Sequence, residues 1–78
     1  LLLEIITIDN TWLRVTMDDV RSKEYSLSPG DRLELQASQH FDLLIGNSDG
    51  LRLLLDGQPV NIRSQSGKVL RLRLPQEG

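Results

Sequence analysis

Residues 46–60 have the sequence GNSDGLRLLLDGQPV, and this stretch decides the class of fold. Turn-forming residues precede the apolar run at 51–55, and the pair Asp56-Gly57 follows it. An Asp-Gly pair between apolar segments is typical of a two-residue β-hairpin turn of type I′. Within the run, leucine occupies every second position from Leu51 to Leu55, which is the period of a strand with one buried face. The stretch therefore predicts short antiparallel strands joined by tight turns.

The same pattern continues along the rest of the chain. Ser28-Pro29-Gly30-Asp31 favours a type II turn, in which glycine takes the positive φ of the third position. Asp18–Ser22 is polar and predicts a hairpin loop. The strands predicted between the turns are Leu3–Ile8, Thr11–Met17, Lys23–Leu27, Arg32–Ala37, His40–Ile45, Leu51–Leu55, Val60–Ile62 and Lys68–Leu74. We therefore predict an all-β fold without helices, a small antiparallel β-sandwich or barrel-like fold of seven to eight short strands joined by tight turns.

Composition limits the size of the protein and its chemistry. The chain has 78 residues, which corresponds to a single small domain spanning 1–78. It contains no cysteine, so neither a disulfide nor a thiolate nucleophile is available. The net charge of −2 argues against binding to nucleic acid by charge alone. The only aromatic residues are Trp12, Tyr25 and Phe41, which offer little surface for stacking on bases.

The sequence has no segment of the kind that crosses a membrane. No apolar run approaches the roughly 20 residues that a membrane-spanning helix requires. The apolar start of the chain is short, contains Glu4, and lacks the basic residues and cleavage site of a signal peptide. Because the first residue is leucine and not methionine, we expect a domain excised from a longer, membrane-anchored protein, with the anchor outside these residues.

Residue types that carry out chemistry are scarce. His40 is the only histidine, and although Asp42 could share its strand face, nothing else completes a catalytic triad or a metal site. We therefore interpret His40 as a surface histidine at a strand edge. Asn47–Gly50 is faintly similar to a calcium loop but lacks the distal glutamate. We interpret Asp18-Asp19 as a solvated pair, and we predict no catalytic, cofactor or metal site.

The outward-facing positions of the predicted strands offer a candidate partner surface. Tryptophan and arginine are enriched at the binding hot spots of protein interfaces. The candidate residues are Trp12, Arg14, Arg52, Leu54, Arg71 and Arg73. Two interpretations stay open for the arginines, contact with a partner or simple solvation. For Trp12 we favour an interpretation in which the indole folds over a sheet end and packs against the core.

Several turns, with their flanking strands, occur in an order that is typical of one family. They are Asn10-Thr11-Trp12-Leu13-Arg14-Val15, Leu27-Ser28-Pro29-Gly30-Asp31, Leu44-Ile45-Gly46-Asn47 leading into Gly50, Asp56-Gly57-Gln58-Pro59-Val60 and Gly67-Lys68-Val69-Leu70. With these motifs, and one tryptophan at the start of the second strand, the chain resembles the extracytoplasmic C-terminal β domain of RodZ-like bacterial cell-shape proteins. Relatives often carry Asp-Gly in the second hairpin, where this chain has Asp18–Ser22.

The resemblance implies a function and a location. RodZ-like proteins have a cytoplasmic helix-turn-helix domain that contacts an actin-like filament protein, followed by one transmembrane helix, a linker and this β domain. The resemblance therefore implies a non-catalytic, extracytoplasmic domain that uses no cofactor, binds no nucleic acid, and contacts cell-wall elongation proteins or envelope components. The alternative that stays open is a peptidoglycan- or glycan-binding β module, in which an exposed aromatic would stack on a sugar.

Overall fold

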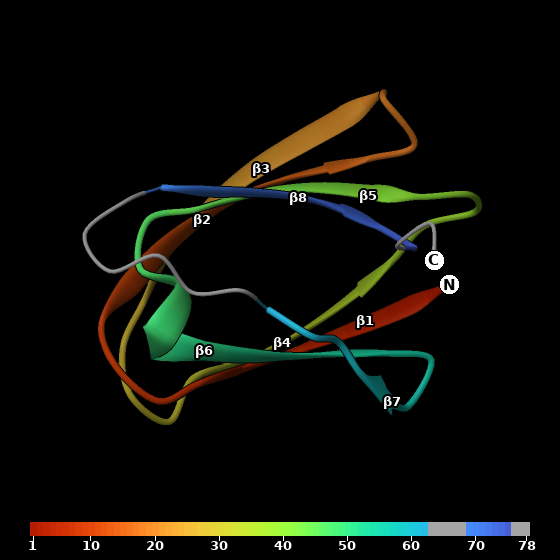
Figure 1. The fold of residues 1–78 in the computed structure, drawn as a ribbon. Helices are drawn as coiled ribbons and strands as arrows, with labels where there is room; N and C mark the ends of the chain where they lie inside the picture. The colour runs from red at the N-terminus through yellow and green to blue at the C-terminus, as the bar shows by residue number, and fades with distance from the viewer. Residues whose placement is uncertain (63–68, 76–78) are drawn as a thin grey trace.

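The protein is a sandwich of eight short strands, seen here in a computed structural model that describes residues 1–62 and 69–75 (Figure 1). The strands are β1 (Leu2–Thr7), β2 (Thr11–Met17), β3 (Arg21–Leu27), β4 (Arg32–Gln36), β5 (Phe41–Ile45), β6 (Leu51–Leu55), β7 (Gln58–Pro59) and β8 (Leu70–Leu74). Apart from one 3-10 turn, η1 (Ser48–Gly50), the described residues form no helix. The predicted first residue of the last strand, Lys68, and the motif residue Gly67 lie outside the described residues.

The strands form two antiparallel sheets of four strands each, in the orders β4-β1-β6-β7 and β3-β2-β5-β8. The chain changes sheet after β1, β3, β4, β5 and β7, so neighbours in sequence mostly belong to opposite sheets (Figure 1). Within a sheet, β1 pairs with β4 and β6, and β2 pairs with β3 and β5. This arrangement confirms the predicted small antiparallel β-sandwich.

The core consists of aliphatic side chains at alternate strand positions. On the central strand β5, Phe41, Leu43 and Ile45 are almost completely buried, while Asp42 and Leu44 between them are not. The same alternation holds in β1, β2 and β6, so that twelve buried apolar residues form one cluster. A fully buried residue of this kind contributes roughly 1.5–3 kcal/mol. Burial of these inward-facing side chains therefore holds the two sheets together, and the period-two pattern of the sequence predicts which side chains they are.

Two predicted turns have the expected backbone. Gly30 has φ of 91°, and the Asp31 amide donates to the Ser28 carbonyl at 3.0 Å, as a turn with glycine in third position requires. Asp56 and Gly57 have φ of 49° and 82°, so both central residues of the β6–β7 hairpin are left-handed. Positive φ at both central positions defines the type I′ turn that the sequence predicted.

Most predicted strands begin or end one or two residues from the bounds in the structure, and two predicted elements need a larger correction. The predicted strand Val60–Ile62 is wrong, because the strand is Gln58–Pro59, directly after the two-residue turn. Proline is tolerated there since β7 lies at the edge of its sheet and needs no amide donor on its open side. The predicted loop Asp18–Ser22 is too long, because Met17 already pairs with Arg21. The strand predicted to begin at Lys23 therefore starts two residues earlier.

Candidate interaction surfaces

Trp12 lies on the outer face of the β3-β2-β5-β8 sheet, with 44% of its surface exposed. The indole covers Gly46 of the adjacent segment so closely that a Cβ at Gly46 would overlap the ring. The Gly46 amide also donates to the Trp12 carbonyl at 2.9 Å. The interpretation that Trp12 folds over a sheet end onto the core is therefore wrong. The bare backbone of glycine lets the indole lie flat on the outside of the sheet.

Arg14 is on the same outer face, two residues along β2. Its Nε donates to Glu24 Oε1 at 2.8 Å, from a position directly across the strand pair. The next pair on this face, Thr16 and Ser22, shares a hydroxyl hydrogen bond of 2.8 Å. Cross-strand pairs of this kind stabilise a sheet by about 0.2–1 kcal/mol each. Arg14 is thus exposed but already paired within the domain.

Arg71 and Arg73 extend this face onto the edge strand β8. In the register of the sheet, Arg71 lies opposite Leu44, and Leu44 lies opposite Arg14. Arg73 lies opposite Asp42, with its Nε 3.9 Å from Asp42 Oδ1. Arg71 has no ion pair among the residues of 1–62 and 69–75. Four of the six predicted surface residues therefore share one face, and we call Trp12, Arg14, Arg71 and Arg73 the tryptophan face.

Arg52 and Leu54 are on the other side of the molecule. They project from β6 on the outer face of the β4-β1-β6-β7 sheet, opposite Ile6 and Glu4 of β1. A cavity of about 500 Å³, lined by Ile6, Ile8, Leu54 and their neighbours, adjoins Arg52 on this side. The full thickness of the sandwich separates the pair from Trp12. The six predicted residues therefore form two surfaces, and a flat partner surface can contact only one of them.

His40 lies just before β5 in a cluster with two carboxylates. Its Nε2 is 3.0 Å from Asp19 Oδ2, without hydrogen-bond alignment, and 3.9 Å from Asp42 Oδ2. Contact with the His40 ring, followed by the charge of Arg73, lowers the pKa of Asp19 below its usual value. The side chain of His40 is only 15% exposed, so its interpretation as a surface histidine is wrong.

The same cluster contains the residue types of a metal site. Asp19, His40 and Asp42 each offer one ligand atom within 4.8 Å of the others. Arg73, however, has its guanidinium 3.9 Å from Asp42 and already supplies a positive charge there. A metal ion bound beside this guanidinium would be repelled by it. We interpret the cluster as an ion-pair network that joins the β2–β3 hairpin to β5 and β8.

Asp18 ties the same hairpin to the segment between β4 and β5. Its carboxylate accepts the backbone amides of Ser38, Gln39 and His40 at 2.8, 2.7 and 3.1 Å. Its own amide donates to the His40 carbonyl at 3.0 Å. The three amides, Ser38 first, lower the pKa of Asp18 below its usual value. The interpretation of Asp18 as a solvated loop residue is therefore wrong, and its role is to connect the two sheets.

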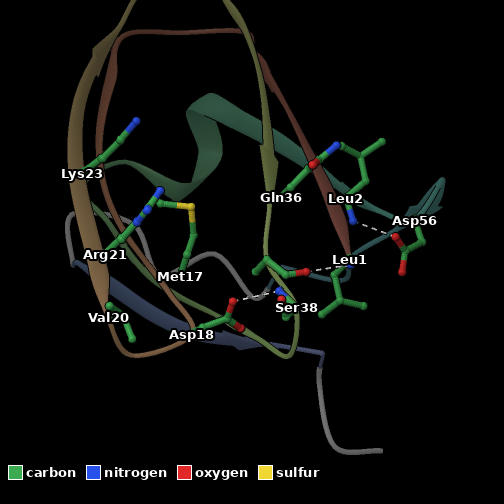
Figure 2. Close-up of a pocket in the computed structure, with 11 residues that line it drawn as sticks. Leu1, Leu2, Met17, Asp18, Val20, Arg21, Lys23, Gln36, Ser38 and Asp56 are labelled. Atoms are coloured by element: carbon green, nitrogen blue, oxygen red, sulfur yellow. Dashed lines mark hydrogen bonds between the residues drawn. The ribbon is translucent and has the colours of Figure 1, made fainter.

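A cleft opens between the sheets where β3 diverges from β4, and sequence reasoning did not find it. The cavity has a volume of about 610 Å³. Figure 2 shows Arg21 and Lys23 on β3 and Met17 on β2 along one side, with Gln36 of β4 across from them. Arg21 was assigned to a loop, so its place in the alternation with Lys23, Tyr25 and Leu27 was missed. Extending that alternation back two residues would have put both basic side chains on the inner face.

The comparisons with known proteins identify the family. The family model described as the RodZ C-terminal domain matches residues 4–73, which is 70 of the 78 residues. That family is non-catalytic. No curated protein and no solved structure matches the chain. Within the described part of the chain, no helix has the length and apolar character needed to span a membrane. Because the match covers nine-tenths of its length, including every described strand except part of β1 and β8, this chain belongs to the RodZ C-terminal domain family.

Proposed function

We propose that this domain is the non-catalytic interaction module of a membrane-anchored RodZ-like protein that links the bacterial actin-like cytoskeleton to cell-wall elongation and cell shape. Membership of the RodZ C-terminal domain family supports this proposal. In it, the domain lies outside the cytoplasm, on a single-span anchor that these residues do not include. Its partners are cell-wall elongation proteins or envelope components.

The observation that carries the proposal is the tryptophan face. An indole that is 44% exposed, held flat on Gly46, is a preformed apolar contact whose conformation is fixed before a partner arrives. A preformed contact loses little conformational freedom on binding, which favours affinity. Arg71 adds a cation that has no ion pair among the described residues. It lies directly opposite Leu44 on the neighbouring strand, so a charge and an apolar side chain are adjacent on this face. Tryptophan and arginine around an apolar centre are the usual composition of a hot spot.

The chemistry of the face selects the kind of partner. The positively charged side chains Arg14, Arg71 and Arg73 lie around Leu44, and among the described residues only two of them are paired with carboxylates, Arg14 with Glu24 and Arg73 with Asp42. A protein surface with an apolar centre and acidic neighbours would complement this arrangement. The outer face of the other sheet offers Arg52 as its comparable cation, which makes that face a matched control.

The experiment replaces Arg71 and Arg73 by glutamate in the full-length protein. We expect loss of normal cell shape and of co-purifying wall-synthesis proteins at an unchanged protein level, because two attractive charges become repulsive. The variant Arg52→Glu changes a cation of the opposite face and should retain both. Unchanged cell shape and unchanged partners in the double variant would show that the tryptophan face is only solvated.

A further inference from the structure

We propose that the cleft beside β3 binds an acidic, extended segment of a partner protein, which adds to the open edge of β3 as an antiparallel strand. The proposal rests on the proposed function, because it names a second surface of the interaction module and the chemistry of what it binds. Three observations carry it, namely the free backbone edge of β3, the unpaired cations on its inner side, and the shape of the cleft.

The open edge of β3 follows from the hydrogen-bond pattern of β2. In an antiparallel ladder, successive residues direct their backbone groups to opposite neighbours. Trp12 accepts from Gly46 and Asp18 donates to His40, so the even-numbered residues of β2 point toward the β5 side. The odd-numbered residues therefore point toward β3. By the register of the pair, Ser22, Glu24 and Ser26 then direct their amides and carbonyls away from β2, to an edge that no described strand covers.

Arg21 and Lys23 occupy positions where a sandwich normally has apolar residues. They lie opposite Met17 and Val15, whose side chains face the other sheet. Both are exposed, and neither has an ion pair within residues 1–62 and 69–75. The cleft also contains Asp18 and Asp56, but these carboxylates already accept backbone amides, in the case of Asp56 the Leu2 amide at 2.7 Å. The β3 side of the cleft is therefore cationic.

The charges determine which strand can pair with β3. Inward-pointing charged residues on an edge strand prevent pairing with apolar strands, because an added apolar strand would bury the charges unpaired. A second copy of β3 in full antiparallel overlap would place Glu24 opposite Glu24, which is repulsive. A strand with carboxylates opposite Arg21 and Lys23 has neither penalty. Since these two positions are alternate residues, the segment recognised has the pattern acidic-x-acidic.

The cleft has the size and lining to accept those side chains. Its volume of about 610 Å³ is within the ordinary range of binding sites, roughly 300–1,000 Å³. Met17 and Ala37 line the cleft with apolar groups, against which the methylene groups of glutamate and of Lys23 can pack. Backbone pairing along β3 would supply affinity, and the two cations would supply specificity for acidic residues.

The test measures binding of a labelled peptide to the 78-residue chain by fluorescence anisotropy. The probe is a capped nine-residue peptide of β-branched residues with glutamate at two alternate positions, and its comparison has glutamine at both. We expect the glutamate peptide to bind, and the double variant Arg21→Gln with Lys23→Gln to weaken it about tenfold, the product of two partly exposed ion pairs. The matched control, Arg32→Gln with Arg52→Gln, removes two cations from the outer face of the β4-β1-β6-β7 sheet and should retain the affinity.

A second measurement tests the mode of binding. Hydrogen exchange with the glutamate peptide present should slow the amides of Ser22, Glu24 and Ser26, and leave those at the edge of β4 unchanged. The inference is overturned if the glutamate peptide does not bind, if the glutamine peptide binds equally well, if both double variants weaken binding equally, or if these amides are not protected. It is also overturned if sedimentation shows that the chain alone forms a dimer through this edge.

The two proposals can fail separately. Loss of peptide binding to the β3 cleft, with an intact cellular effect at Arg71 and Arg73, would leave the proposed function standing and remove this site. The opposite result is peptide binding that depends on Arg21 and Lys23, together with normal cell shape in the Arg71 and Arg73 variant. That result would support the cleft as a binding site and contradict the assignment of the tryptophan face as a hot spot.

Discussion

Gly46 determines where the indole of Trp12 lies. Glycine is required there because of close approach, since any Cβ would overlap the ring, and not because of a left-handed backbone. Asp18 is the second residue on which local structure depends, because one carboxylate satisfies three consecutive amides at the end of the sandwich. The role of Asp18 depends on its side chain, and the role of Gly46 depends on having none, so one substitution tests each of them.

Replacing Gly46 by alanine should displace the indole from the sheet. We expect a red-shifted Trp12 emission with stronger quenching by acrylamide, and a loss of about 1 kcal/mol in the free energy of unfolding from local overpacking. The control is Gly57→Ala, which has no atom within 4 Å of its Cβ but has φ of 82°. That variant should lose about 1 kcal/mol through backbone strain and leave Trp12 emission unchanged. Unaltered emission in Gly46→Ala would contradict the flat packing.

Replacing Asp18 by asparagine should lower the thermal midpoint of unfolding at neutral pH. Asparagine tolerates the φ of 52° at this position but lacks the charge that three amides stabilise. Because the folded-state pKa of Asp18 lies below its usual value of 3.8, the stabilisation is complete above that value. It is lost as the pH falls through the lower folded-state pKa.

The measurement for Asp18 is a series of thermal unfolding curves between pH 7 and pH 2. The wild type and Asp18→Asn should differ most at neutral pH and converge at the acid end. The control is Asp49→Asn. Asp49 is exposed, and its carboxylate accepts no hydrogen bond from the described residues, so the thermal midpoint of this variant should match that of the wild type at every pH. A difference that grows toward low pH would contradict the assigned role.

At the scale of the elements, β5 is a central strand that contributes directly to the core. It lies between β2 and β8 in its sheet, and every second side chain enters the core. β3 is its opposite, because four exposed residues at its start leave it outside the core, and only Tyr25 and Leu27 pack inward. The two strands differ in the residues at their inward-facing positions, which are all apolar in β5 and include two basic residues at the start of β3. β5 therefore contributes more buried side chains to the core than β3, whose edge is open.

The contrast between neighbouring leucines of β5 tests this distribution. Leu43→Ala should cost about 2–5 kcal/mol in the free energy of unfolding, because Leu43 is 1% exposed and its removal leaves a cavity. For a domain of this size that is a large share of the total stability. Leu44→Ala changes the same atoms on the outer face and should cost less than half as much. Equal losses in urea unfolding would show that β5 does not alternate as described.

For the molecule as a whole, the two outer faces and the open β3 edge point in different directions, so one small domain can present several surfaces. The proposed placement outside the cytoplasm makes these surfaces available to the envelope. These 78 residues contain no cysteine, so an introduced cysteine would be the only one in this domain and could report on its placement. Val20 is suited to it, because it is 82% exposed at the tip of the β2–β3 hairpin.

We expect Val20→Cys in the full-length protein to react with a membrane-impermeant maleimide in intact spheroplasts as fully as after lysis. The parent protein without the substitution gives the background. Labelling only after lysis would contradict an extracytoplasmic domain. Partial labelling that rises on lysis would indicate that part of the protein is inverted or unexported, and it would count against the proposed placement.

The sequence by itself determined the strands, most turns and the core. Alternation of leucine and β-branched residues, and pairs such as Asp56-Gly57, act over a few residues, so their consequences are visible without the fold. The family resemblance came from the same local motifs in order, and the match over residues 4–73 confirms it. The start of β3 was missed because Arg21 interrupts the apolar pattern at an inward position.

Only the tertiary structure decided which strands are neighbours, and with that, which side chains share a surface. It placed Trp12 and Arg14 on one face with Arg71 and Arg73, and Arg52 and Leu54 on the other. It also brought Asp18 to the amides of 38–40, and opened the cleft beside Arg21 and Lys23. The physical reason is that a two-residue period says which side of its own strand a side chain occupies. The sheet that the strand joins is fixed by connections that cross the core, and these contacts are distant in sequence.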